Sequence, residues 1–445
     1  MSRQFFGTDG VRGRVGIEPL TADFALRLAN AAARSIGRDR GTVVIGKDTR
    51  LSGYMFESAL EAGFVSAGFN ALMTGPLPTP GIAFLTHKFG ADLGVVISAS
   101  HNRYFDNGIK FFDGSGAKLS DETEARIEEL TLQGPITRDS AELGKAKRID
   151  TAQVYYEEFL RDSFPAGMSL AGLKLVVDCA HGATYKIAPR VFSELGAEII
   201  PIGCSPNGRN INDGCGSTQP ALLQMTVKGV GADLGLALDG DGDRVVMVDH
   251  EGQLIDGDQL LYILAVGRQR DGQLKGPVVG TVMSNLGLER KLQSLGIEFM
   301  RSKVGDRYVL EMLRKYGGIL GGESSGHILC LDKTTTGDGV ISALEVLAEV
   351  KRTGRSLAEL AAEMPRYPQR LINVTVSQKI DLESHAAIQL ARKRAEDGLG
   401  DRGRIVLRAS GTEPLIRVMV EGEQEAEVEQ VAQDLAQQVV DLAGS

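Results

Sequence analysis

The 445-residue chain has no tryptophan, few other aromatic residues and no excess of positive charge. Aromatic residues make up 5% of the chain, and 58 acidic residues against 49 basic ones give a net charge of −9. Broad nucleic-acid binding needs a basic surface, and base stacking needs aromatic platforms, so the composition argues against both. Any anionic substrate must then be held by local basic loops rather than by the field of the whole protein.

Cysteine and long apolar runs are also scarce. The four cysteines, at positions 179, 204, 215 and 330, form no CxxC pair, which argues against a zinc site or a disulfide framework and favours a reducing compartment. The longest apolar stretch, Leu260–Val266, is too short to span a membrane, and the N-terminus has no apolar leader segment. We therefore expect a cytoplasmic protein that binds neither membranes nor nucleic acid.

Glycine, in contrast, is abundant: 55 of the 445 residues are Gly, about 12% against a usual ~7%. Much of this excess lies in polar loops that follow repeated apolar segments. Ala91–Gly94 and Ala232–Gly235 share the sequence Ala-Asp-Leu-Gly, and Gly318–Gly321 is a looser third copy. Upstream of each copy, an apolar strand precedes a helix-like segment. This alternation predicts three similar α/β units with ligand-binding loops at the ends of their strands.

The pattern changes after Pro365 and Pro368. Leu371–Val376 alternates like a strand, and the segments beyond it predict a helix, two strands and a final helix. The predicted fold is therefore α/β: three similar domains with mixed sheets between helices, and a smaller C-terminal β-α-β-β-α domain, around a central cleft. The expected domains are residues 1–150, 151–253, 254–367 and 368–445.

The loop Asp239-Gly240-Asp241-Gly242-Asp243 is the strongest chemical signal. Carboxylates at alternate positions of an extended chain project to one side, where they repel unless a cation lies among them. An EF-hand starting at Asp239 is excluded, because Arg244 and His250 occupy the positions that require Gly and Glu. A few carboxylates on a short loop suit Mg²⁺, so Asp239, Asp241 and Asp243 are predicted metal ligands.

Ser100-His101-Asn102 ends the apolar strand of the first repeat. If the repeats align, Ser100 falls at the position of Asp241, so its oxygen can approach the same cation as a phosphoryl acceptor must. The plainer alternative is a capping hydroxyl before a turn. His101 is either an orienting neighbour or a local hydrogen-bond partner. No G-x-S-x-G motif surrounds Ser100, which argues against an esterase triad.

Two further loops carry groups suited to a phosphorylated sugar. Arg408–Pro414, followed by Arg417, resembles a phosphate cradle, with backbone approach at Gly411, hydroxyl donors on Ser410 and Thr412, and two guanidinium groups. The alternative there is a hairpin turn with incidental charges. The second loop, Gly322–His327, offers donors and acceptors for a polyol. Its candidate ligands are Glu323, Ser325 and His327. Together, these loops indicate phosphoryl transfer on a phosphorylated polyol.

In this order the loops resemble the signature motifs of the α-D-phosphohexomutase superfamily over the full chain. The matching segments are Ser100–Asn102, Asp239–Arg244, Gly322–His327 and Arg408–Pro414. Phe6–Gly13 and Asp106–Phe112 resemble the bacterial branch that acts on glucosamine phosphate. Arg103, where proline is common, and Ser324, where the family varies, depart from the usual pattern without removing a required chemical group.

The resemblance implies that Ser100 carries a phosphate, and that Asp239, Asp241, Asp243 and a phosphoserine oxygen hold one Mg²⁺. It implies conversion of glucosamine 6-phosphate to glucosamine 1-phosphate through a 1,6-bisphosphate, with glucosamine or glucose 1,6-bisphosphate as activator. The product would supply UDP-N-acetylglucosamine and cell-wall precursors. A homodimer is weakly favoured over a monomer.

By the same resemblance, the substrate phosphate binds to the Ser410–Thr412 cradle, Arg408 and Arg417, with Arg244 as a further substrate ligand. Lys110, Arg12 and His327 match residues placed near acid–base work, with His101 beside them. A lysine close to a cation such as Arg12 would have a lowered pKa, which would make Lys110 a base near neutral pH.

Three alternatives remain open at this point. The first is a mutase of the same superfamily that acts on glucose or mannose phosphates, to be distinguished at Glu323. The second is a Mg²⁺-dependent sugar phosphatase that uses Ser100 as a transient acceptor. The third is a sugar-phosphate sensor on an inactive scaffold, against which the intact Ser100 and three loop aspartates argue.

Overall fold

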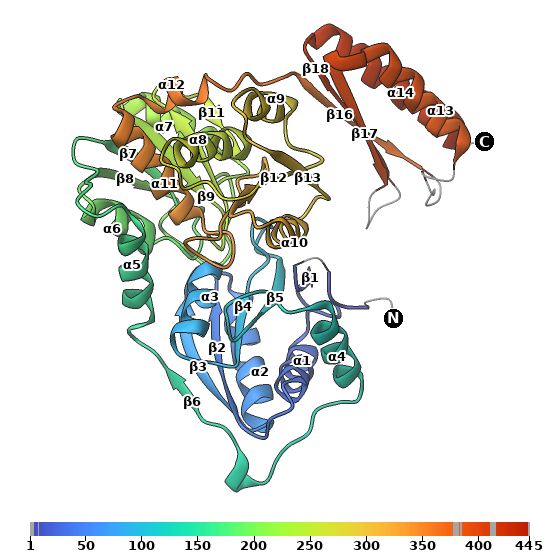
Figure 1. The fold of residues 1–445 in the computed structure, drawn as a ribbon. Helices are drawn as coiled ribbons and strands as arrows, with labels where there is room; N and C mark the ends of the chain where they lie inside the picture. Colours follow the sequence, from blue (N-terminus) through green and yellow to red (C-terminus); the bar gives the residue numbers. More distant parts are fainter. Residues whose placement is uncertain (1–3, 8, 377–381, 383–384, 410–414, 444–445) are drawn as a thin grey trace.

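The computed structural model describes residues 4–7, 9–376, 382, 385–409 and 415–443 (Figure 1). They form three α/β units and a smaller C-terminal unit, which projects to one side of the others in Figure 1. None of the helices in these residues is long and apolar enough to cross a membrane. All four cysteines are free thiols.

The first unit contains a six-stranded mixed sheet with the order β1-β5-β4-β2-β3-β6. Its strands are β1 (Val11–Arg14), β2 (Gly41–Lys47), β3 (Phe69–Pro76), β4 (Leu93–Ile97), β5 (Asp106–Asp113) and β6 (Ala146–Arg148). Its helices are α1 (Ala22–Ser35), α2 (Ser52–Ser66), α3 (Thr79–Lys88) and α4 (Asp121–Leu132). Every residue of β4 is buried, as expected for a continuous apolar strand in a sheet covered on both faces.

The second unit has a five-stranded sheet with the order β11-β10-β9-β7-β8. Its strands are β7 (Lys174–Asp178), β8 (Glu198–Ile202), β9 (Leu234–Leu238), β10 (Val245–Asp249) and β11 (Leu254–Ile255). The associated helices are α5 (Ala152–Ser163), α6 (Ile187–Glu194) and α7 (Ala221–Val230).

The third unit has a four-stranded sheet with the order β13-β12-β14-β15. Its strands are β12 (Val278–Thr281), β13 (Phe299–Ser302), β14 (Leu320–Gly322) and β15 (Ile328–Cys330). Its helices are α8 (Gly257–Arg270), α9 (Leu286–Ser294), α10 (Asp306–Tyr316), α11 (Gly339–Thr353) and α12 (Leu357–Ala361). In each of the three units an antiparallel strand pair, β4–β5, β9–β10 or β14–β15, is joined by the polar loop of the sequence repeat.

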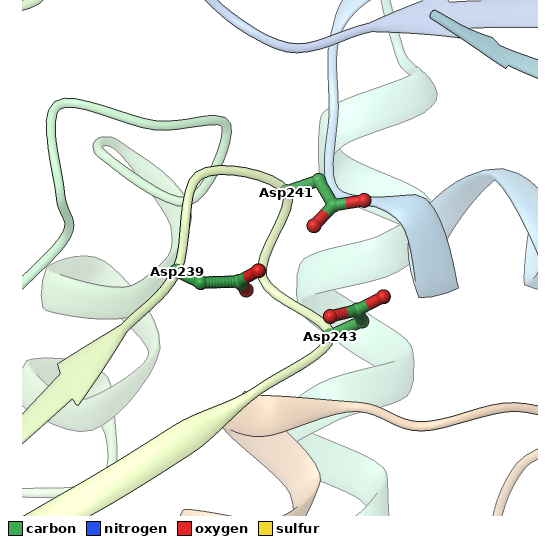
Figure 2. Close-up of side chains that lie close together, drawn as sticks. All are labelled: Asp239, Asp241 and Asp243. Atoms are coloured by element: carbon green, nitrogen blue, oxygen red, sulfur yellow. The ribbon is translucent and has the colours of Figure 1, made fainter. Parts of the chain in front are cut away.

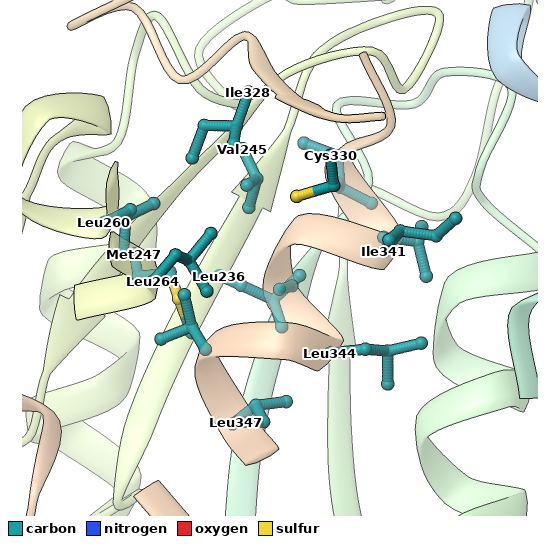
Figure 3. Packing of buried hydrophobic residues seen from close by; sticks show 14 of the residues in the cluster. Leu236, Val245, Met247, Leu260, Leu264, Ile328, Cys330, Ile341, Leu344 and Leu347 are labelled. Carbon is teal, nitrogen blue, oxygen red and sulfur yellow. The ribbon is translucent and has the colours of Figure 1, made fainter. Parts of the chain in front are cut away.

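The second and third units share a hydrophobic core. Figure 3 shows Leu236 and Met247 of the second sheet beside Leu264 of α8, and Ile341 and Leu344 of α11 belong to the same cluster of buried residues. Full burial of each such side chain contributes roughly 1.5–3 kcal/mol. Because α8 and α11 also pack on β14 and β15, the loops at the ends of both sheets are held in one framework.

The C-terminal unit has the predicted β-α-β-β-α order and a separate core. Its elements are β16 (Gln369–Thr375), α13 (Ala386–Leu399), β17 (Gly403–Ala409), β18 (Leu415–Gly422) and α14 (Glu425–Ala443). β18 lies between β16 and β17 and is antiparallel to both. Three similar mixed α/β units and a smaller C-terminal domain confirm the predicted fold class.

A polar joint connects the third unit to the C-terminal domain. Asn285 exchanges two 3.0 Å hydrogen bonds with the backbone of Tyr367, donating to its carbonyl and accepting from its N–H. Arg404, from β17, donates to the carbonyl oxygens of Val282 at 2.8 Å and Ser284 at 2.6 Å. Arg290 of α9 also forms a 2.7 Å ion pair with Glu423 of the C-terminal domain. The joint is therefore polar, whereas the second and third units are joined by buried apolar side chains.

Candidate active site

Asp239, Asp241 and Asp243 converge in the β9–β10 loop (Figure 2). One carboxylate oxygen from each lies within 4.8 Å of the others, and all three residues are buried. Burial, together with the charges of Asp243 and Asp241, raises the pKa of Asp239. Oδ1 of Asp241 and Oδ1 of Asp243 have no hydrogen-bond partner among the described residues. Buried, mutually repelling carboxylates with free oxygens fit a hard cation such as a divalent metal.

Ser100 lies against this cluster. Its Oγ donates a hydrogen bond to Oδ2 of Asp239 at 2.5 Å. Its φ of +51° is left-handed, and the surrounding groups hold it there: its N–H donates to Oγ of Ser98 at 2.9 Å, and its carbonyl accepts from Asn212 at 2.9 Å and Arg50 at 3.1 Å. A costly backbone conformation held by several contacts is typical of a functional site.

Gly240 allows this close approach. A Cβ on Gly240 would lie 2.6 Å from the Ser100 carbonyl oxygen, closer than real Cβ atoms come. The glycine of the aspartate loop is therefore required for the serine loop to pack on it.

His101 lies beside Ser100, and Arg12 lies close enough to His101 to influence its charge. Nδ1 of His101 is 3.5 Å from Ser100 Oγ. Burial, and then the neighbouring charges of Arg244 and Arg12, lower the pKa of His101 to about 4. The imidazole is therefore neutral at pH 7. Arg12 pairs with Asp9 of the N-terminal loop.

Lys110 overturns one expectation from the sequence. Its Nζ lies 2.8 Å from Asp241, 3.0 Å from Asp9 and 3.4 Å from Asp243. Burial alone would lower the pKa of Lys110, but these three carboxylates raise it overall. The prediction of a lowered pKa was wrong because it considered Arg12 and not the acids. At pH 7 Lys110 is therefore a cation.

The β14–β15 loop carries Glu323 and His327 and brings His327 to Asp243 of the aspartate cluster. Nδ1 of His327 is 3.6 Å from Asp243, and its Nε2 is 3.3 Å from Asp306. Burial lowers the pKa of His327, but Asp243 and Asp306 raise it to about 9 overall, so the ring is protonated at pH 7. Glu323 accepts a hydrogen bond from the Gly305 N–H at 2.9 Å. Ser325, between them, is exposed.

Arg408 and Arg417 face each other across β17 and β18 as direct cross-strand partners. Burial and the charge of Arg417 lower the pKa of Arg408, which reports the repulsion between the two. Nε of each has no hydrogen-bond partner among the described residues, and the same holds for Nε of Arg12 and Arg244. Like charges placed directly opposite are destabilising unless an anion joins them. Ser410, Gly411 and Thr412 lie outside the described residues.

Several residues of the site carry no sequence motif. Thr79, at the start of α3, donates to Asp241 Oδ2 at 2.6 Å. Asp9, Lys118 and Asp306 form ion pairs at the edge of the cleft. Asp9 lies in the Phe6–Gly13 segment, which the sequence marked only by its family resemblance, whereas nothing in the sequence distinguished Thr79, Lys118 and Asp306.

The chain is similar to known proteins over its whole length. Models for the alpha/beta/alpha domains I, II and III and the C-terminal domain of phosphoglucomutase/phosphomannomutase match residues 3–135, 154–252, 256–367 and 371–438. The phosphoglucosamine mutases of Aeromonas hydrophila subsp. hydrophila and Nitrosococcus oceani are each 57% identical to it over 441 residues. The alignments cover 99% of this chain and 99% and 98% of those proteins.

Solved structures share the fold. A phosphoglucomutase/phosphomannomutase family protein from Burkholderia thailandensis has a TM-score of 0.83 and 23% identity, covering 99% of this chain and 98% of that one. Aspergillus fumigatus N-acetylphosphoglucosamine mutase, in complex with GlcNAc-6P and magnesium, has a TM-score of 0.68 and 19% identity, covering 99% and 96%. Together with the full-length identity to curated relatives, these matches place the chain: it belongs to the phosphoglucosamine mutases, isomerases of the phosphoglucomutase/phosphomannomutase family.

Proposed function

We propose that the phosphoryl group in this mutase passes through Ser100, which is phosphorylated in the active enzyme. The observation that carries the proposal is the 2.5 Å hydrogen bond from Ser100 Oγ to Asp239, inside a cluster of buried carboxylates. A hydroxyl held there can carry a phosphoryl group beside a bound cation. No other serine oxygen is recorded in contact with the three aspartates in the described part of the chain.

Asp239, Asp241, Asp243 and a phosphoserine oxygen are the proposed ligands of one Mg²⁺. Bound there, Mg²⁺ would neutralise charge on the transferring phosphoryl group. Oδ1 of Asp241 has no hydrogen-bond partner among the described residues, and the contact of Oδ1 of Asp243 with His327 is long, at 3.6 Å. Both observations support this assignment. Lys110 then holds its own positive charge beside the same carboxylates and orients them.

We assign substrate binding to residues of the third unit and the C-terminal domain. Arg408 and Arg417, with the Ser410–Thr412 loop, would bind the phosphate that is not being transferred. Their unpaired Nε atoms and mutual repulsion support an anion site. Glu323 and Ser325 would contact the sugar hydroxyls and amine. Arg12 and Arg244, at the Ser100 side of the cleft, would contact the transferring phosphate.

In the proposed first transfer, sugar O1 attacks the phosphorus on Ser100. The O1–P bond forms and the Oγ–P bond breaks, while O1 loses a proton and Oγ gains one. Lys110 is cationic and supplies the proton to Oγ, which leaves it able to receive the proton from O1. His327 is a second charged donor at the cleft. Neutral His101, 3.5 Å from Oγ, orients the serine.

The resulting glucosamine 1,6-bisphosphate must reorient within the site while it stays bound, so that its 6-phosphate faces Ser100. Ser100 Oγ then attacks the phosphorus on O6, and breaking the O6–P bond restores the phosphoserine and leaves glucosamine 1-phosphate. Domains at residues 1–150, 151–253, 254–367 and 368–445 would contribute the serine, metal, sugar and phosphate loops in turn. The separate core of the C-terminal domain and the polar contacts of Arg404 and Glu423 with the third unit support its rotation during this step. We also propose a cytoplasmic location, which rests on the unpaired cysteines and the short apolar runs of the sequence. A homodimer and a role in supplying UDP-N-acetylglucosamine rest on the sequence resemblance.

Phosphorus NMR tests the proposal. Protein, Mg²⁺ and a catalytic amount of glucose 1,6-bisphosphate are mixed in separate tubes with glucosamine, glucose or mannose 6-phosphate. We expect the fastest conversion for glucosamine 6-phosphate, with no free phosphate. Ser100→Ala should abolish turnover, whereas Ser115→Ala, a matched change at an exposed serine, should not. Inorganic phosphate as the main product, or turnover by Ser100→Ala, would refute the phosphoserine route.

A further inference from the structure

Lys118 and Asp306 form an ion pair between the first and third units, outside every motif described above. Lys118 follows β5, and Asp306 is the first residue of α10. Both side chains are 15% exposed, at the edge of the cleft. Their meeting joins two units that are far apart in sequence.

Each member of this pair forms a further ion pair with a residue of the site. On one side, Lys118 Nζ lies 2.7 Å from Asp9 Oδ1, and the other oxygen of Asp9 lies 3.0 Å from Lys110 Nζ. On the other side, Asp306 Oδ2 lies 3.3 Å from His327 Nε2. A continuous series of ion pairs therefore runs from Lys110, beside the aspartates, to His327 in the β14–β15 loop (Gly322–His327, the sugar loop).

The start of α10 also holds the other end of the sugar loop. The N–H of Gly305 donates to Oε1 of Glu323 at 2.9 Å. Residues 305 and 306 thus contact both Glu323 and His327. Burial alone would raise the pKa of Asp306, but Lys118 and His327 lower it overall. Burial alone would lower the pKa of Lys118, but Asp306 and Asp9 raise it overall. Both groups are therefore charged at pH 7.

We propose that Lys118 and Asp306 are positioning residues of the mutase, which hold His327 and Glu323 in a fixed position relative to Ser100. This inference rests on the proposed function, because it assigns to the pair the orientation of groups that would contact the sugar. It is needed because the sugar loop belongs to the third unit and Ser100 to the first. A side chain that orients such a group is commonly worth a 10- to 100-fold change in activity, roughly as large as many direct contacts.

A substitution at the neighbouring Arg307 distinguishes a positioning role from a general contribution to the stability of the interface between the first and third units. Arg307 donates to Glu124 at 3.1 Å and to the carbonyl of Leu119 at 2.9 Å, so it joins the same two units. Neither Glu124 nor the Leu119 carbonyl belongs to the series of ion pairs from Lys110 to His327. Arg307→Ala therefore weakens the interface without removing a charge from the series of ion pairs.

The test measures kcat and KM for glucosamine 6-phosphate in full-length wild type, Asp306→Asn, Lys118→Met, the double variant and Arg307→Ala. Asp306→Asn should lower kcat about 10- to 100-fold with a smaller change in KM, and Asp306→Glu should recover part of the loss. The double variant should lose no more than the worse single variant, because the two residues act as one unit. Arg307→Ala should keep the wild-type kcat. Thermal unfolding of each variant confirms that it is folded.

The inference is overturned if Asp306→Asn turns over like wild type, if Arg307→Ala loses as much kcat, or if the losses of the two single variants multiply in the double variant. Failure of the proposed function looks different. In that case the wild type itself shows no transfer through Ser100, which would overturn both.

Discussion

Replacing Lys110 by methionine removes the positive charge that Asp9, Asp241 and Asp243 share while keeping the length of the side chain. Its side chain is only 3% exposed, so solvent screens these ion pairs little. Removing one partner of a buried ion pair costs about 3–5 kcal/mol, because the remaining charges are left buried and uncompensated. We expect a loss of this size in metal-free protein, together with a large loss of kcat.

Divalent metal should return much of that stability. In Lys110→Met the carboxylates lack their lysine, so a cation among them no longer competes with Nζ. A ligand at about a hundredfold excess over its Kd stabilises the folded state by about 2.7 kcal/mol. The variant should therefore gain more stability from Mg²⁺ than the wild type gains.

Urea unfolding in EDTA and in Mg²⁺, followed by circular dichroism, measures both effects. Lys47→Met is the matched control, because Lys47 is equally buried and is paired with Glu57 away from the aspartate loop. It should lose stability without an extra response to Mg²⁺. Equal Mg²⁺ responses in the two variants, or an unchanged Lys110→Met in EDTA, would refute the assignment of Lys110 and the metal ligands.

Two further predictions concern the C-terminal domain and a buried acid at the start of α8. Arg417→Ala should weaken binding of glucosamine 6-phosphate about 10- to 100-fold, as expected for losing a charge-assisted hydrogen bond, and should leave unphosphorylated glucosamine unaffected in calorimetry. Arg370→Ala, at an exposed arginine of β16, is the control. Equal losses of affinity in the two variants would contradict the assignment of Arg417 to phosphate binding. Burial and the charge of Asp256 raise the pKa of Asp258 to about 7, so the native state binds a proton that the unfolded chain has released, and stability falls as pH rises from about 4 to about 7. Asp258→Asn should remove that fall in the free energy of unfolding, which is at most about 4 kcal/mol at pH 8. Urea unfolding at pH 5 and pH 8 measures it. A variant whose stability falls between these pH values as much as that of the wild type would contradict the prediction.

Sequence periodicity and repeats predicted the architecture well, because buried strands and amphipathic helices are local patterns. β16 (Gln369–Thr375) and α14 (Glu425–Ala443) lie close to the strand and helix predicted there. The alignment of repeats also led to the expectation that Ser100 approaches the aspartate loop, since equivalent loops end equivalent strands. What decides that approach is the left-handed Ser100 and the missing side chain at position 240, which only the packed structure displays.

The electrostatics of the site depend on contacts between residues that are distant in sequence. The direction of the Lys110 pKa shift was missed because Asp241 and Asp243 belong to another domain and the sequence does not say how close they come. Lys118 and Asp306 were missed for the same reason: each is an ordinary charged residue at the end of an element. Only the meeting of the first and third units makes them partners.

The left-handed backbone at position 100 also restricts which hydroxyl amino acid can occupy the position that we propose as phosphate carrier. Threonine has the same hydroxyl, but its branched Cβ crowds the backbone at positive φ, where β-branched residues are genuine outliers. Serine meets the chemical and the steric requirement together. The main-chain conformation, rather than the chemistry of the hydroxyl, thus favours serine over threonine at this position.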